Sequence, residues 1–261
     1  MSVTSLTQPT AKRSKTRSPE EQTVREELAA VYRIFGALGM DDLIYTHISA
    51  RVPGADHHFL INPFGLMYEE VTASNLVKID LEGNIVEDTG YPINYAGFLI
   101  HGAIHEKAPD AHCVIHLHTD SGVAVSCQRE GLLDASQFGM FLPGGIAYHD
   151  YEGLALDEDE KPRLVADLGD RKAMILRNHG TLTVGETVAE AFFHMYNLDR
   201  ACRVQVLAQA GGQAEVVRIP AEIVEHTRAQ KPVGSRFGGY GQIELAAWMR
   251  KLDRMGVPFR D

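Results

Sequence analysis

The chain has 261 residues, of which 44% are hydrophobic and 23% charged, and a formal net charge of −10 at pH 7. These values are typical of one large α/β domain with a substantial core. The negative charge disfavours nucleic acid and anionic membrane as partners, and no apolar run approaches the roughly 20 residues of a membrane-spanning helix.

Residues 1–17 read as a disordered tail, because they are rich in Ser and Thr and carry the chain's only basic cluster. Residues 18–261 are predicted to form one domain, since neither an internal repeat nor an interdomain linker is visible. The N-terminus lacks the apolar segment of a secretory signal, and the three cysteines form no Cys-x-x-Cys pair. We therefore expect reduced thiols in a cytoplasmic protein.

The predicted elements alternate between helices and short strands. Capping-box signatures open a helix after Ser18 and a long helix after Thr187. Further helices are predicted over 95–107 and in the C-terminal segment GQIELAAWMRKLDRM. Strands are predicted at LIYTHISARV, FLIN, LVKID, NIVE, CVIHLHTDSGVAVS and GIAYHDY, and a strand–turn–strand at KAMILRNHGTLTVG. Hairpins interleaved with helices favour one sheet covered by helices over a purely parallel βαβ array.

Two histidines, His116 and His118, interrupt an otherwise apolar strand. Strand alternation places both on one face, with Cα atoms about 6.5–7 Å apart, and imidazoles at that spacing can bind one ion at about 2.1 Å each. His-x-His alone is also consistent with two histidines bonded to backbone carbonyls or water. His179 is a candidate third ligand, because Gly180 beside it permits a tight backbone turn that would aim the ring inward. An isolated His before Gly also fits an ordinary turn residue.

The combination of APDAHCVIHLHT with the later RNHGTLTVGETVAEAFFHMYNLDRACRVQ resembles the class II aldolase/adducin family over nearly the whole folded chain. The resemblance implies a three-layer α/β/α fold with a mixed, largely antiparallel central sheet. It also implies a homotetramer with active sites at subunit interfaces, and one divalent metal ion bound by His116, His118 and His179. Zinc is the leading metal, and iron, manganese and cobalt also accept imidazole ligands.

Three positions depart from the sugar-phosphate aldolases of this family. The position of their catalytic glutamate falls on Gly97, Phe64 stands in place of a phosphate-binding serine, and His47 stands where an asparagine is expected. The adducin branch has lost the metal histidines, whereas this chain keeps all three.

We therefore predict a metal-dependent lyase that acts on a small, non-phosphorylated hydroxy, keto or aromatic acid. The reaction is aldol cleavage or decarboxylation through a metal-stabilised enolate, since both build up the same charge. The alternatives are a non-haem iron oxygenase that uses the same three histidines, and a non-catalytic, adducin-like interaction module.

With the glutamate replaced, His47 is the first candidate for proton transfer, because an unperturbed imidazole titrates near neutral pH. Tyr148 and His149 are the next candidates, and for all three a structural hydrogen bond is the alternative role. Arg51 is a candidate for binding a substrate carboxylate, with a surface salt bridge as its alternative.

Three further histidines lie on predicted helices. His101 and His105 have the spacing of a helical metal-binding pair, but no acidic third ligand stands at a telling distance. We interpret them as polar residues of the helix surface or core, and His194 as a packed residue of the long helix.

Overall fold

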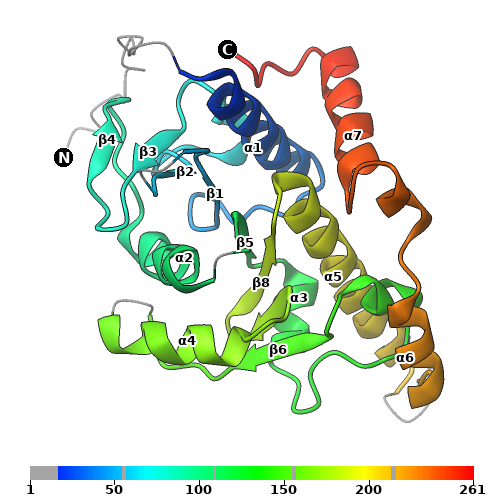
Figure 1. The fold of residues 1–261 in the computed structure, drawn as a ribbon. Helices are drawn as coiled ribbons and strands as arrows, with labels where there is room; N and C mark the ends of the chain where they lie inside the picture. Colours follow the sequence, from blue (N-terminus) through cyan, green and yellow to red (C-terminus); the bar gives the residue numbers. More distant parts are fainter. Residues whose placement is uncertain (1–16, 55–56, 109, 155–156, 213–215) are drawn as a thin grey trace.

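The computed structural model describes residues 17–261 except for 55–56, 109, 155–156 and 213–215. The predicted disordered tail, apart from Arg17, therefore lies outside the described residues. One eight-stranded sheet with the order β4-β3-β2-β1-β5-β8-β7-β6 forms the middle of the molecule (Figure 1). Its strands are β1 (His47–Arg51), β2 (Phe59–Ile61), β3 (Val77–Ile79), β4 (Ile85–Glu87), β5 (Cys113–Leu117), β6 (Ile146–His149), β7 (Ala173–Leu176) and β8 (Gly180–Gly185). Neighbouring strands are antiparallel except for β6 and β7, which are parallel.

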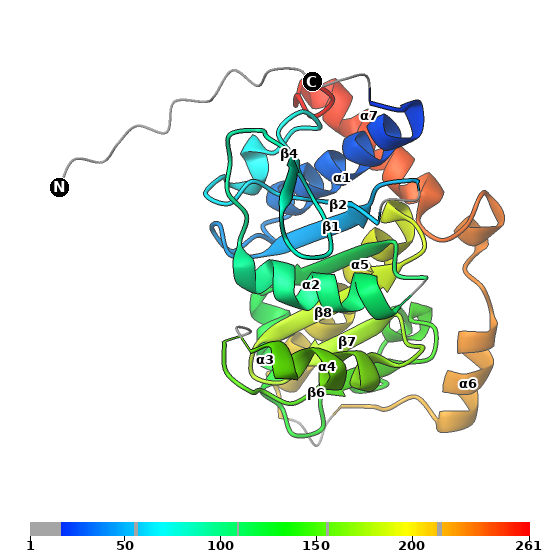
Figure 2. The same ribbon diagram turned by 60° about the vertical axis from the view of Figure 1, so that its left-hand side comes forward.

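Helices cover both faces of this sheet (Figures 1 and 2). The α-helices are α1 (Pro19–Ala37), α2 (Tyr95–Lys107), α3 (Asp120–Ser126), α4 (Lys161–Leu168), α5 (Val188–Gln209), α6 (Ala221–Ala229) and α7 (Gln242–Met255). Short 3₁₀ helices are η1 (Tyr68–Glu70), η2 (Gln137–Phe141), η3 (Glu158–Glu160) and η5 (Val233–Arg236). Within the described part of the chain, no helix combines the length and apolarity needed to cross a bilayer.

Among the described residues, four apolar clusters hold the three layers together, and the two largest lie on opposite faces of the sheet. On one face, α1, α5 and α7 pack against β1 and β5. On the other face, α2 and α4 pack against β5, β7 and β8. The predicted fold, an α/β/α arrangement with a mixed and largely antiparallel sheet, is confirmed.

Local signals fix where the main helices begin. The hydroxyl of Ser18 accepts a hydrogen bond from the backbone N–H of Glu21 at 3.1 Å, and that of Thr187 accepts one from the N–H of Glu190 at 3.0 Å. These bonds satisfy N–H groups that have no partner inside the first helical turn. Both predicted helix starts are confirmed.

The segment predicted as one strand, CVIHLHTDSGVAVS, is a strand followed by a helix. Strand β5 ends at Leu117, and the hydroxyl of Thr119 caps α3 by accepting a hydrogen bond from the N–H of Gly122 at 3.1 Å. The β-branched residues of α3 mimic a strand composition, but the cap and the contacts of α3 with α5 decide otherwise. As a result, His118 lies just beyond the strand end, where the chain turns into a helix.

The polar face of β1 is buried. His47 is 4% exposed and Ser49 0% exposed, and both lie in contact with side chains of α2. On β5, the apolar neighbours of His116 on either side belong to the core under α1 and α5, so His116 faces α2 as well. The sheet face toward α2 therefore carries the histidines of both central strands.

A pH dependence of stability follows from His194, which is fully buried in α5 and donates from Nδ1 to the carbonyl oxygen of Val184. Burial lowers the pKa of His194 from 6.5 to about 4. Between these values the unfolded chain binds a proton that the folded chain excludes, so stability is lost as the pH falls. We expect His194→Gln to flatten the pH dependence of the unfolding free energy by up to about 1.4 kcal/mol per pH unit. Urea denaturation at several pH values measures this, and equal slopes in the two proteins would contradict it.

Candidate metal site

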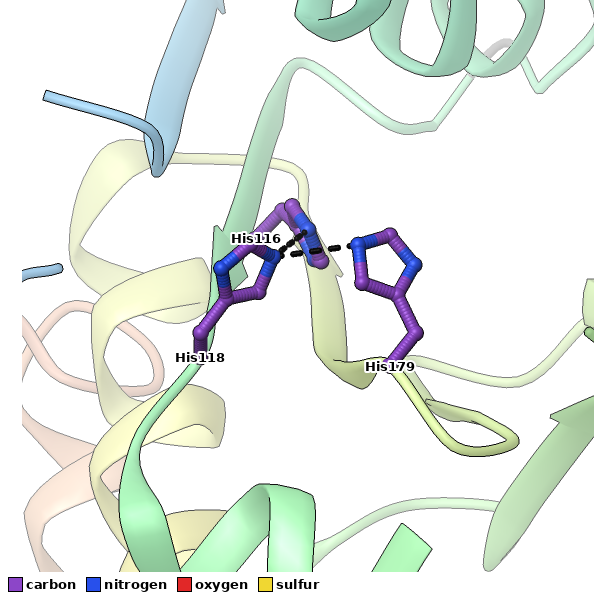
Figure 3. Close-up of side chains that lie close together, drawn as sticks. All are labelled: His116, His118 and His179. Atoms are coloured by element: carbon purple, nitrogen blue, oxygen red, sulfur yellow. Dashed lines mark hydrogen bonds between the residues drawn. The ribbon is translucent and has the colours of Figure 1, made fainter. Parts of the chain in front are cut away.

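Three imidazole rings converge where β5 ends and where the turn between β7 and β8 approaches it (Figure 3). Nε2 of His118 lies 2.9 Å from Nε2 of His116 and 3.0 Å from Nε2 of His179. One nitrogen from each ring lies within 4.8 Å of the other two. The structure thus brings together the three histidines that the sequence singled out, although they come from segments far apart in the chain.

Hydrogen bonds on the far side of two rings determine which nitrogens face each other. Nδ1 of His116 lies 3.0 Å from the carbonyl oxygen of Thr181, and Nδ1 of His118 lies 3.0 Å from Oδ2 of Asp42. Carbonyl and carboxylate oxygens only accept, so both Nδ1 atoms donate, and in a ring that carries a single proton Nε2 then carries the lone pair. Lone pairs repel each other at 2.9 Å unless a cation lies between them.

The donor set fits a divalent metal. Ligands at about 2.1 Å in a tetrahedral arrangement lie about 3.4 Å apart, close to the observed nitrogen separations. Burial and neighbouring histidine rings hold the pKa of His116 well below its usual range, and burial lowers that of His179 to about 4. Neutral imidazole is the form that binds metal ions, so these two rings need no deprotonation at pH 7.

The backbone around His179 allows the two sequence segments to meet. Asn178 adopts φ 58°, a left-handed conformation that Asn tolerates better than most residues. A Cβ atom at Gly180 would lie 2.6 Å from the carbonyl oxygen of Leu117. We expected Gly180 to permit the turn itself. In the structure Asn178 makes the turn, and Gly180 permits the close approach of β8 to β5.

His47 occupies the space into which a side chain at position 97 would project. A Cβ atom at Gly97 would lie 2.5 Å from Cδ2 and 2.8 Å from Nε2 of His47. The ring centroid of His47 is 5.1 Å from that of His116, and its Nδ1 is 2.9 Å from Nε2 of His101. His47 is therefore adjacent to the cluster, where the resemblance would have placed the glutamate.

Tyr148 and His149, the other candidates for proton transfer, make structural contacts. The hydroxyl of Tyr148 accepts a hydrogen bond from the backbone N–H of Leu132 at 3.0 Å, and its ring packs against the core beside α3 and α5. His149 lies between the carboxylates of Asp167 at 2.7 Å and Glu160 at 3.3 Å. These contacts give no support to a role at the histidine cluster.

Arg51 likewise lies away from the cluster. Its guanidinium group donates to the carbonyl oxygens of His105 and Ala108 at the C-terminal end of α2. It sits four residues along β1 from His47, about 13 Å at the usual strand rise. These contacts cap α2 and give no support to the predicted role in binding a substrate at the cluster.

Two neighbours of the cluster were missed from the sequence. Asp42, which orients His118, is 76 positions away from it in the chain, so no local pattern connects them. Tyr151 has its ring centroid 6.5 Å from that of His179 and is 54% exposed. The segment YHDYEG drew attention to this region, but Tyr148 on β6 is half-buried against the core beside α3 and α5, and Tyr151 lies beside the cluster.

A cleft of ≈ 720 Å³ opens beside His118 between α1, α3 and α5. Its walls include Asp42, Ser121, Arg200 and Arg203. Both charge signs are therefore present within a cavity large enough for a small organic acid.

A packing prediction follows from the contact between His47 and Gly97. Gly97→Ala normally stabilises a helix by roughly 0.5–1 kcal/mol, but here the added Cβ must displace the ring of His47. We expect Gly97→Ala to destabilise the wild-type chain by about 1–3 kcal/mol and to stabilise it in a His47→Ala background. Denaturant unfolding of the four proteins in this cycle measures the coupling, and the same effect in both backgrounds would show that the two side chains do not compete for space.

Comparisons with known proteins agree with the fold and identify the family. The family model of the Class II Aldolase and Adducin N-terminal domain matches residues 26–206. The crystal structure of an aldolase II superfamily protein from Pseudomonas syringae has a TM-score of 0.87 and 48% identity, covering 94% of this chain and 98% of that one. L-fuculose 1-phosphate aldolase from Glaciozyma antarctica PI12 has a TM-score of 0.79 and 29% identity, covering 95% and 97%. Alpha-adducin of Rattus norvegicus is 45% identical over an alignment of length 256, which covers 92% of this chain but 35% of that protein. This chain belongs to the class II aldolase/adducin family.

Proposed function

We propose that the protein is a divalent-metal-dependent lyase whose ion is held by His116, His118 and His179. The observation that carries this proposal is the convergence of their Nε2 atoms while hydrogen bonds occupy the Nδ1 atoms of His116 and His118. Three imidazole ligands leave at least one coordination position for a substrate, which is typical of catalytic and not of structural sites. Zinc is the metal we propose first, with iron, manganese and cobalt as alternatives.

A divalent cation in this position would polarise a substrate oxygen and stabilise negative charge on it. Aldol cleavage and decarboxylation both develop such charge next to the bond that breaks, so the site supports either reaction. We propose His47 as the group that accepts or returns the proton, because its buried ring stands beside His116 in the space of residue 97. In this proposal His47 takes the role of the glutamate whose position is occupied by Gly97.

We propose a small, non-phosphorylated hydroxy, keto or aromatic acid as the substrate. The cleft beside His118 carries Arg200 and Arg203, and a guanidinium group can bind a carboxylate through two parallel hydrogen bonds. These two arginines replace Arg51 as our candidates for that contact. The homotetramer with active sites at subunit interfaces stays part of the proposal on the strength of the family resemblance.

The relatives include a protein whose name does not denote an enzyme. The 45% identity to alpha-adducin extends over 92% of this chain, which makes a non-catalytic interaction module the alternative from a different class. The three histidines weigh against it, because an interaction module has no need for converging lone pairs. An iron oxygenase that uses the same ligands is the alternative within the enzymes.

Metal content tests the site itself. We expect protein purified without chelator or nickel affinity resin to hold close to one equivalent of a transition metal. Asp42→Asn should lower the metal affinity by roughly 10–100-fold, because the ring of His118 loses the carboxylate that orients it. Asp41→Asn, which changes the neighbouring carboxylate, is the matched control and should bind like the wild type. Chelator competition with elemental analysis measures both, and wild-type protein that binds no metal would exclude the proposed site.

Activity assays separate the reactions. A panel of hydroxy, keto and aromatic acids with supplied Zn²⁺, Mn²⁺ or Fe²⁺ should yield carbon dioxide or an aldehyde product. His47→Asn should lower kcat by about 10²–10⁴-fold while metal binding persists, as expected for loss of an acid–base group. Oxygen uptake by the iron-bound protein would show that the protein is an oxygenase and not a lyase. A metal-loaded protein that turns over none of these acids would favour the interaction module.

A further inference from the structure

A buried chain of polar side chains runs beneath α2 from His47 toward the end of that helix. Nδ1 of His47 is 2.9 Å from Nε2 of His101, and Nδ1 of His101 is 2.6 Å from Oγ of Ser49. The same hydroxyl is 2.7 Å from Nε2 of His105, whose Nδ1 is 2.9 Å from the carbonyl oxygen of Ala111. None of the four side-chain residues is more than 4% exposed.

The carbonyl oxygen at the end of this chain determines the direction of every hydrogen bond in it. It can only accept, so Nδ1 of His105 carries the proton and Nε2 of the neutral ring accepts from the hydroxyl of Ser49. That hydroxyl has one proton, so its oxygen accepts from Nδ1 of His101. Nε2 of His101 is then an acceptor, and Nδ1 of His47 must be the donor.

The chain requires rings that carry a single proton, and their surroundings favour that state. Burial, with the guanidinium of Arg51 nearby, lowers the pKa of His105 to about 3. Burial and the neighbouring His105 hold the pKa of His101 well below its usual range. Both rings are neutral at pH 7, so each has one donor and one acceptor nitrogen.

We propose that His105, Ser49 and His101 are positioning residues that hold His47 in one tautomer, with Nδ1 as donor and Nε2 as acceptor. The inference rests on the proposed function, because proton transfer by His47 is the reason for fixing its tautomer. Nε2 lies 2.8 Å from where a Cβ atom at Gly97 would stand, and the described residues provide no hydrogen-bond partner for it. The site therefore presents a fixed acceptor to a hydroxyl group of a ligand or water beside the cluster.

This arrangement gives a role to two helix histidines that have metal-ligand spacing and are hydrogen-bonded to one serine. His101 and His105 share the face of α2 that lies on β1, and Ser49 bridges them. A carboxylate at position 97 would be an acceptor without assistance. An imidazole is an acceptor at a given nitrogen only if another group fixes its proton on the other side.

The test is the protonation of each ring nitrogen in metal-free protein, read from the ¹⁵N chemical shifts of its histidine side chains. In the wild type at pH 7 we expect His47 and His101 to be protonated at Nδ1 and unprotonated at Nε2, with signals assigned by their loss in His47→Asn and His101→Asn. A wild-type His47 that is protonated at Nε2 would overturn the proposal without any further variant.

A matched pair of substitutions tests the link through Ser49. Ser49→Val and Ser49→Thr add similar volume at the same buried position, but only threonine keeps the hydroxyl. We expect the single tautomer of His47 to become a mixture in Ser49→Val and to persist in Ser49→Thr. If His47 keeps its tautomer in Ser49→Val, the chain does not control it.

The metal titration of the preceding subsection separates the two proposals. Both Ser49 variants should bind metal like the wild type, since neither alters a proposed ligand. A wild type that shows the expected tautomer but binds no metal would refute the proposed function and leave the hydrogen-bond chain intact. A wild type that binds metal but has His47 protonated at Nε2 would leave the proposed metal site intact and refute the control of His47 by the hydrogen-bond chain.

Discussion

The hydrogen bond from Nδ1 of His116 to the carbonyl oxygen of Thr181 is the interaction on which the candidate site depends. It joins β5 to β8, two strands paired so that His116 lies opposite Leu182. The bond fixes both the orientation of the ring and the position of its proton, so that the lone pair on Nε2 faces His118. The geometry of the site thus follows from the register of the sheet, since a slip of one residue would turn His116 into the opposite core.

The same physical device recurs beneath α2. Thr181 anchors the proton of His116, and Ala111 anchors that of His105. A backbone carbonyl is a reliable anchor because it never donates and because secondary structure holds it in place. In His116, the opposite ring nitrogen faces the histidine cluster directly. In His105, the fixed proton determines the direction of the hydrogen bonds that lead through Ser49 and His101 to His47. Buried polar groups of this kind are costly unless they are hydrogen-bonded, and here both ring nitrogens of His101 and His105 and the hydroxyl of Ser49 have partners, while Nε2 of His47 alone is left to accept from a ligand or water.

The ring of His47 fills the space in which a side chain at position 97 would lie. The site therefore keeps a polar group although Gly97 stands at the motif position of the glutamate. The side chain in this space comes from β1 and not from α2, and glycine at position 97 is what leaves room for it. A position-by-position comparison of the motif therefore indicates that the acid–base residue is missing. In the structure, the space beside Gly97 holds the imidazole of His47. Within a family that contains both aldolases and adducins, function has to be argued from such local chemistry, since the fold is shared.

The sequence by itself determined the fold class, the two capped helices and the identity of the three clustered histidines. Those features depend on local periodicity, on hydrogen bonds within one helical turn, and on motifs that mark the family. Tertiary structure alone decided that α2 buries the polar face of β1, that Asp42 orients His118, and that Tyr151, not Tyr148, flanks His179. Alternation along a strand shows which residues share a face, but strand order and helix docking determine what covers that face. The roles of His47 and Arg51 diverged for this reason: they share one face of one strand, but the start of β1 lies at the cluster and its end lies at the C-terminus of α2.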